Sequence, residues 1–188
     1  MAEALKSRGP LDGVALPRSE RIAIRLAPRA ARVVLRGSAE VASRVGERFG
    51  AMPSPLPCRA SEAGGRAALW LGPDEWLLIA EGERPEELGR VLETAIEDLP
   101  HSLVDVSQRQ LGLELTGAAA ARALSAGCPL DLDVRSFANG DATRTMLAKA
   151  EVVLWRRGPF RFHIEVWRSF ADYVVAFVNE AALRAPPR

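Results

Sequence analysis

The chain has 188 residues and carries 25 basic and 24 acidic side chains, for a formal net charge of +1. A near-neutral chain has no broad positive field to attract nucleic acid or anionic lipid, so we expect no nucleic-acid partner and no membrane partner. Hydrophobic residues make up 48% and charged residues 26%, which are ordinary globular values and exclude a disordered or fibrous protein.

The sequence shows no recognisable targeting signal. Residues 1–20 hold no continuous apolar stretch of the signal-peptide kind, and no apolar run approaches the roughly 18–20 residues that span a bilayer. We therefore expect a soluble, cytoplasmic protein.

Cys58 and Cys128 are too few for a disulfide framework, and no CxxC or Cys/His cluster predicts a zinc site.

The first half of the chain begins with an arm over residues 1–18, in which Gly and Pro recur without a period. Ser38 is placed to cap a helix that starts at residue 39. The elements expected after the arm are a half-buried strand near 22–26, a strand at 32–35, a helix at 39–49, a Pro-rich loop at 53–65, a hairpin with strands at 67–71 and 75–80, and a helix at 85–98.

The second half repeats this order. Its expected elements are a strand at 110–115, a helix at 118–126, a loop at 127–142, strands within about 143–156, a turn at 157–159, a strand at 160–167 and a helix at 169–184. Gly37 and Gly117 correspond, each between a strand and a helix, where glycine accepts backbone conformations that other residues avoid. The pattern predicts an α+β fold with antiparallel-rich sheets covered by helices on one side. A single domain over 19–188 would consist of two pseudo-repeats, at about 20–100 and 101–184.

Two strands of the second half carry information about packing. The run Val152–Trp155 is apolar on both faces, so its strand is either central in a layered core or covered by another chain. Together with the four Trp, this run predicts that the isolated chain exposes apolar surface and associates. In the strand that ends at Trp167, alternation groups Arg161, His163, Glu165 and Trp167 on one face, which we expect to be the polar one.

Candidate catalytic residues are few. His101 is expected to be a solvated edge residue, and His163 to make a surface ion pair or hydrogen bond; neither accompanies a nucleophile motif. Gly64-Gly65 precedes a strand rather than a helix and reads as a flexible loop, not a phosphate cradle. Asp131 and Asp133 fit a capped turn, with calcium binding or acid–base chemistry as the alternative.

Two aromatic segments have both a packing and a binding interpretation. Trp70 and Trp76 flank a Gly-Pro-Asp turn and either anchor the hairpin in the core or form a binding platform. The segment 167–173 is a helix start in which Ser169 can cap and Asp172 lies in the first turn. Its Trp, Arg and Tyr also suit a contact surface.

Several stretches resemble known families. The run HSLVDVSQRQLGLELTGAAAARAL (101–124) resembles the opening motif of the folate-dependent aminomethyltransferases, the T-protein of glycine cleavage. The runs WLGPDEWLL (70–78), CPLDL (128–132), TRTMLAKAEVVLW (143–155) and EVWRSFADYV (165–174) together resemble the γ subunit of heterotetrameric sarcosine oxidase, of the same superfamily. The resemblance covers about residues 20–184 and implies an aminomethyltransferase folate-binding-domain-like fold.

The resemblance implies a non-catalytic γ subunit of a large bacterial flavoenzyme. That enzyme oxidatively demethylates sarcosine to glycine with hydrogen peroxide, and yields formaldehyde or methylene-tetrahydrofolate. The family implies α, β and δ subunits as partners, which hold FAD, FMN, NAD, tetrahydrofolate and zinc. No catalytic, cofactor-binding or metal-binding residue is expected in this chain.

The chain departs from the T-protein where that family is catalytic. Lys149-Ala150-Glu151-Val152 stands where the T-protein has a Gly-Gly-x-x-Asp-Asp-like stretch with a catalytic Asp, which argues against methylene transfer. The Lys-Gly-Cys motif of the related iron–sulfur repair proteins is also missing around Cys58 and Cys128. A free-standing folate-binding protein and an independent enzyme with an unrecognised site are the alternatives. Arg168 would pair with a folate carboxylate in the former, or with a partner subunit in the γ-subunit case.

Overall fold

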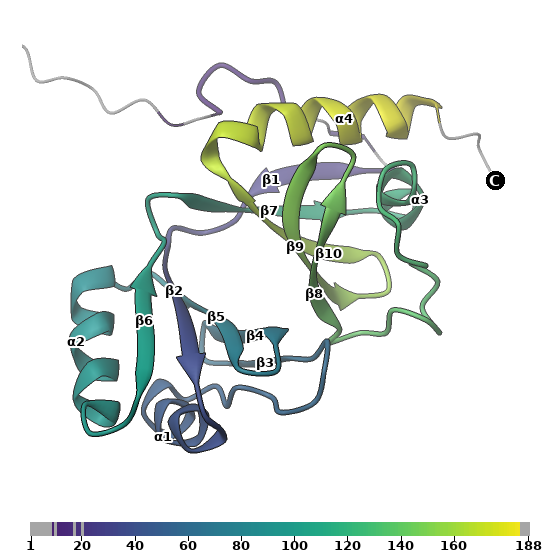
Figure 1. Cartoon of the computed structure of the whole chain (residues 1–188). Coiled ribbons are helices and arrows are strands. Elements are labelled where there is room, and N and C mark those ends of the chain that lie inside the picture. Colours follow the sequence, from purple (N-terminus) through teal and green to yellow (C-terminus); the bar gives the residue numbers. More distant parts are fainter. Residues whose placement is uncertain (1–8, 10, 17, 20, 185–188) are drawn as a thin grey trace, which may run out of the picture.

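A computed structural model of the chain describes residues 9, 11–16, 18, 19 and 21–184. Most of the arm expected over residues 1–18 lies outside these residues. Two five-stranded antiparallel sheets pack against each other, and Figure 1 shows α3 and α4 beside one sheet and α1 and α2 beside the other.

The two sheets have matching strand orders. Sheet A has the order β1-β7-β10-β9-β8, with bounds Ala23–Leu26, Gln110–Thr116, Arg161–Trp167, Ala150–Gly158 and Ala142–Leu147. Sheet B has the order β6-β2-β5-β4-β3, with bounds His101–Asp105, Ala30–Gly37, Glu75–Glu81, Arg66–Gly72 and Ala60–Ala63. The helices are α1 (Ala39–Phe49), α2 (Pro85–Ile96), α3 (Ala120–Ser125), the 3-10 turn η1 (Arg168–Phe170) and α4 (Ala171–Arg184). Within the described part of the chain, no helix is long and apolar enough to cross a membrane.

The two halves exchange their first strands. The chain runs β1-β2-α1-β3-β4-β5-α2 and then β6-β7-α3-β8-β9-β10-α4. However, β1 pairs with β7 of the second half, and β6 pairs with β2 of the first. Each sheet therefore contains a strand from the other half, so that backbone hydrogen bonds as well as side chains join the halves.

Strand β9 is central in a layered core. Val152 and Leu154 pack among the residues under α3 and α4, whereas Val153 and Trp155 pack between the two sheets. All four side chains are buried within this chain. The layered-core alternative is thus correct. The expectation that this strand gives the isolated chain an exposed apolar surface is wrong, because sheet B covers its second face.

Local signals explain several elements. The N–H of Val41 donates to Ser38 Oγ over 3.3 Å, which confirms the predicted cap of α1. Trp76 is buried and its indole N–H donates to the carbonyl of Ser54 over 2.9 Å, so this Trp anchors the hairpin to the Pro-rich loop, as its core interpretation predicts. Gly117 has φ +123, and a Cβ there would lie 2.2 Å from the carbonyl oxygen of Arg21.

One loop was predicted too long. Residues 60–63 of the expected loop 53–65 form strand β3, and Gly64 and Gly65 form the tight turn that leads into β4, both with positive φ. This strand, of sequence Ala-Ser-Glu-Ala, has no β-branched or aromatic residue, so its composition does not predict a strand. Pairing with β4 overrides that weak local preference.

Candidate functional site

The expected polar face of β10 lies between the sheets. His163 is 4% exposed and Glu165 is 1% exposed, so the expected surface position of His163 is wrong, whereas the hydrogen bond expected for it is present, with Glu165 as its partner. Alternation did group these side chains on one face, but sheet B covers that face. Arg32 of β2, which contacts Glu165 from the other sheet, is 133 positions away in the sequence.

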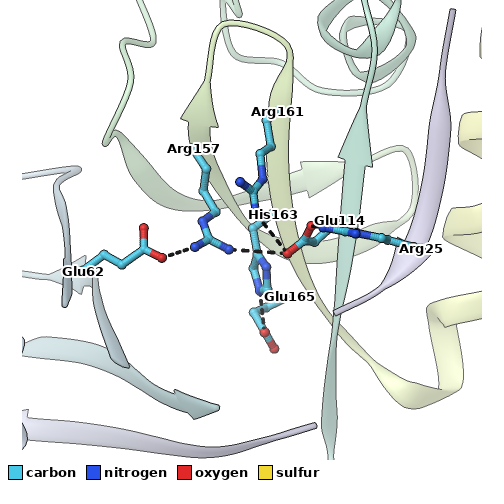
Figure 2. A network of polar contacts seen from close by, with 7 residues as sticks. All are labelled: Arg25, Glu62, Glu114, Arg157, Arg161, His163 and Glu165. Carbon is cyan, nitrogen blue, oxygen red and sulfur yellow. Dashed lines mark hydrogen bonds and ion pairs between the residues drawn. The ribbon is translucent and has the colours of Figure 1, made fainter. Parts of the chain in front are cut away.

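A buried ion cluster, which we define as Arg32, His163 and Glu165, spans the two sheets. Arg32 Nε of β2 donates to Glu165 Oε2 of β10 over 2.6 Å, and its Nη1 donates to the carbonyl of Ala30 over 3.0 Å. His163 Nε2 lies 2.7 Å from Glu165 Oε1, and Figure 2 shows this pair at the centre of the polar contacts. Since an ionised carboxylate only accepts hydrogen bonds, His163 Nε2 carries the hydrogen.

The protonation state of the cluster follows from opposing effects. Burial raises the pKa of Glu165, but the hydrogen bond from His163 and the positive charge of Arg32 outweigh it, so that the pKa lies below its ordinary value. Glu165 is therefore an anion at neutral pH with both oxygens engaged. Such a carboxylate has no proton to give as a general acid, and its lowered pKa makes it a weak base.

Gly112 leaves the space for this cluster. A Cβ at Gly112 would lie 2.8 Å from His163 Cε1 and 2.9 Å from Glu165 Oε1, closer than van der Waals contact allows. The ring of Trp155 lies beside His163, with centroids 5.8 Å apart. Among the described residues, none gives His163 Nδ1 a hydrogen-bond partner, although this atom is buried. The cluster is thus packed closely against Gly112 and Trp155.

A second network surrounds Glu114 on β7. This buried carboxylate lies 2.6 Å from Arg25, 3.4 Å from Arg157 and 3.5 Å from Arg161. Arg157 also pairs with Glu62 of β3, across the sheet interface (Figure 2). Burial raises the pKa of Glu114, but the hydrogen bond from Arg25 and the charges of the arginines lower it below its ordinary value. Glu114 is held as an anion in the same way as Glu165.

Arg156 is also a buried charged residue, but it lies on the opposite face of sheet A. It is 1% exposed and donates to the carbonyls of Leu132 and Pro159, while its guanidinium lies over the ring of Phe162 at 4.4 Å. Burial lowers its pKa. This arginine fixes the long loop before β8 onto the sheet.

These networks hold the sheets together rather than present reactive groups. Ion pairs from Arg32, Arg157 and Arg144 each join a residue of one sheet to a carboxylate of the other, the last with Glu75 over 2.7 Å. Arg32, Glu62 and Glu114 were not predicted as members of these networks. The available signal was Arg32 within the apolar residues 30–35 of β2, since a charge in a buried strand requires a partner.

The remaining histidine and aspartates have structural roles. His101 opens the edge strand β6, but its side chain is largely covered and its ring nitrogens meet Leu99 O at 2.7 Å and Glu93 at 3.1 Å, so the expected solvated position is wrong. The hydrogen bond to Leu99 raises its pKa. Asp131 Oδ1 accepts from the N–H of Asp133, which confirms the predicted capped turn. Among the described residues, no three His, Cys, Asp or Glu side chains gather as metal ligands would.

The segment from β10 to α4 holds the last predicted residues. Arg168 opens η1, and its backbone N–H donates to the carbonyl of Arg109 over 2.8 Å. Ser169 lies inside this 3-10 turn, so its predicted capping role is wrong, whereas Asp172 lies in the first turn of α4 as expected. Glu151, the acid nearest to the family's catalytic position, is exposed and 3.9 Å from Arg144.

Comparisons with known proteins match this architecture. Residues 38–184 match the model of the "Sarcosine oxidase, gamma subunit family". Sarcosine oxidase subunit gamma of Corynebacterium sp. (strain P-1) is 38% identical over 146 residues, covering 77% of this chain and 69% of that protein.

Two solved structures show the same fold. A chain of the heterotetrameric sarcosine oxidase from Corynebacterium sp. U-96, in complex with pyrrole 2-carboxylate, superposes with a TM-score of 0.86 and 30% identity, over 97% of this chain and 98% of that one. Aminomethyltransferase T of the glycine cleavage system from Bartonella henselae superposes with a TM-score of 0.63 and 13% identity, over 84% of this chain and 45% of that one. The predicted fold class is confirmed.

Proposed function

The chain belongs to the sarcosine oxidase gamma subunit family, and from this premise we propose that it is a non-catalytic subunit that supports assembly of a heterotetrameric sarcosine oxidase. The observation that carries the proposal is the likeness, over nearly its whole length, to a chain of a solved heterotetramer of that name. Its partners in the proposal are the α, β and δ subunits, in the cytoplasm. The assembled enzyme converts sarcosine, O2 and water to glycine, formaldehyde and hydrogen peroxide, or passes the one-carbon unit to tetrahydrofolate.

The proposal assigns FAD, FMN, NAD, tetrahydrofolate and zinc to the partner subunits. The residues of this chain do not fit a folate transfer site. Glu151 lies on the surface beside Arg144, and the space between the sheets is filled by Leu69, Trp155 and the buried ion cluster. A hollow of about 380 Å³ lies instead on the outer surface beside α2, where Arg48, Arg90 and Val91 contribute to its lining. We therefore derive no chemical step through folate in this chain.

The ionised state of the buried acids supports a structural role. Glu165 and Glu114 are both held as anions by basic neighbours in the same chain. Catalytic acids and bases need a pKa matched to their task, whereas these two are moved away from neutrality. Their contribution in the proposal is to fix the two sheets relative to each other, so that the outer surface is preorganised for partner subunits.

The experiment that tests the non-catalytic role uses the purified full chain without partners. We expect no flavin absorbance, no sarcosine-dependent hydrogen peroxide and no saturable binding of tetrahydrofolate in a calorimetric titration. A stoichiometric flavin or peroxide production would contradict the proposal. Saturable folate binding by the lone chain would instead support a free-standing folate-binding protein.

A further inference from the structure

One end of sheet A, where β10 passes into α4, carries an exposed group of large hydrophobic side chains. Met146 is 42% exposed, Trp167 39%, Phe170 39% and Tyr173 37%. Single exposed apolar residues are normal on a protein surface, but a contiguous group marks an interaction site. The contacts of these residues decide whether they are contiguous.

Contacts join the segment 167–173 to the neighbouring strand ends, and Met146 lies there as the strand partner of Glu151 at the start of β9. The Arg109 guanidinium lies over the Trp167 ring at 5.1 Å, and the carbonyl of Arg109 accepts from the N–H of Arg168. The N–H of Lys149 in the β8–β9 turn lies 3.4 Å from Tyr173 Oη in α4. Figure 1 shows this turn beneath α4. The starts of β7 and β9 and the ends of β8 and β10 therefore meet the first turn of α4 at one edge of the molecule.

The same edge is rich in cations. We define the aromatic rim as Met146, Trp167, Phe170 and Tyr173 with Arg109, Lys149 and Arg168. In the described part of the chain, no ion pair joins the side chains of Arg109, Lys149 or Arg168 to a carboxylate. The acids at this edge are Asp172, whose Oδ1 accepts from the N–H of Tyr173, and Glu151, which is the strand partner of Met146 and lies 3.9 Å from Arg144. The rim thus combines apolar area with an excess of positive charge, unlike the near-neutral chain as a whole.

We propose that the aromatic rim is a docking surface for a segment of another subunit of the oxidase that carries carboxylates beside apolar side chains. This inference rests on the proposed assembly function. Trp, Tyr and Arg dominate binding energy at protein interfaces, and a guanidinium can pair with a carboxylate in two parallel hydrogen bonds. A second copy of this chain fits less well. In a two-fold contact the rim faces itself and brings like charges together.

The test titrates the full chain against a purified complex of the other three subunits, with sedimentation as the readout. Arg168→Glu reverses a rim charge and Phe170→Ala removes exposed apolar area. Arg90→Glu, on the exposed face of α2 beside the other sheet, is the matched control. We expect Arg168→Glu to raise the Kd about 30-fold or more, as loss of a hot-spot residue does. Phe170→Ala should raise it about tenfold, and Arg90→Glu should leave it within about threefold. Thermal melting of each isolated variant confirms that it folds.

The outcomes separate this inference from the function on which it rests. A wild-type chain that does not bind the other subunits contradicts the proposed function, and the rim inference with it. Wild-type binding that neither rim variant weakens more than the control contradicts the rim inference alone. Self-association of the wild-type chain that Arg168→Glu abolishes would identify the occupant as a second copy and overturn the proposed partner. If the increase in Kd caused by Arg168→Glu becomes smaller as the salt concentration is raised, the result supports an acidic partner, because salt screens exposed charge pairs.

Discussion

The Arg32–Glu165 pair and the Arg44–Asp98 pair join the same kinds of group at nearly the same distance, 2.6 and 2.7 Å, in opposite surroundings. The first lies between the sheets with both side chains almost fully covered. The second lies on the surface, where Arg44 of α1 reaches Asp98 just after α2, with side chains 38% and 61% exposed. Water already solvates the surface ions, so their pairing adds little to the stability of the fold. Each buried ion has lost this water and depends on its partner for stabilisation.

Burial decides which charged pairs in this protein hold the fold. A buried ion without its partner costs several kcal/mol, and this cost makes one relative placement of the two sheets far more stable than others. Surface pairs impose no such constraint. The variants below test whether position, rather than the chemistry of the pair, determines the effect.

The largest effect is expected from Glu165→Ala. This change leaves the charge of Arg32 buried without its carboxylate and His163 Nε2 without its acceptor, and we expect the free energy of unfolding to fall by about 3–5 kcal/mol. Urea unfolding followed by Trp fluorescence measures it. Replacing the cluster together, with Arg32→Met, His163→Phe and Glu165→Met, should recover most of the loss because no unpaired charge remains. A loss below about 1 kcal/mol for Glu165→Ala would show that the cluster is not what joins the sheets.

Acid should weaken the same contacts. The folded-state pKa values of Glu165 and Glu114 are below their ordinary values, so their contribution is complete above the unfolded-state pKa of about 4.3 and is lost as pH falls through the folded-state pKa. Each unit of lowering is worth about 1.4 kcal/mol. Unfolding free energies measured at descending pH should decline below about pH 5. A Glu114→Gln variant should decline less steeply, and stability that rises below pH 5 would contradict the assignment.

A smaller effect is expected from filling the space that Gly112 leaves beside the buried ion cluster. Gly112→Ala places a methyl group against His163 and Glu165, and we expect it to cost about 1–3 kcal/mol through overpacking. Gly89→Ala in α2 is the control, since among the described residues nothing beyond the adjoining turns of the helix lies within 4 Å of a Cβ there, and alanine favours a helix. Thermal melting should show a lower melting temperature for Gly112→Ala and a higher one for Gly89→Ala. Equal melting temperatures would mean that the cluster tolerates displacement.

The smallest effect belongs to the surface pair. Arg44→Ala removes contacts to Asp98 and Glu40 that are exposed to water, so we expect almost no change in the free energy of unfolding. Urea unfolding under the conditions used for Glu165→Ala gives the direct comparison. A loss of stability as large as that of Glu165→Ala would remove the distinction between buried and surface pairs.

The sequence predicted local structure well, because caps, turns and strand alternation are encoded by near neighbours. Ser38, the hairpin around Trp76 and the shared face of His163 and Glu165 are examples. The strand exchange and the covering of that face were not predictable, since they depend on pairings such as Arg32 with Glu165, 133 positions apart. Alternation predicts which side chains share a face of a strand. Whether that face is exposed to solvent or buried depends on the packing of the second sheet.

The candidate site, too, was predictable from the sequence only in part. The resemblance in the segments around 70–78 and 143–155 predicted the family, which the comparisons confirm. The buried ion cluster was missed because polar residues in a strand are expected to face solvent. The role of Arg168 stays a prediction, now placed within a defined surface.

The most direct test of the central claim is the composition and activity of the oxidase expressed with and without this subunit. We predict that the four subunits co-purify in equal amounts and produce hydrogen peroxide from sarcosine. Omission of this chain should lower the yield of assembled complex, while the flavin content and turnover of whatever assembles stay close to those of the complete enzyme. A complex that assembles in full without this chain, yet loses its turnover, would contradict the account and assign this subunit a direct part in catalysis.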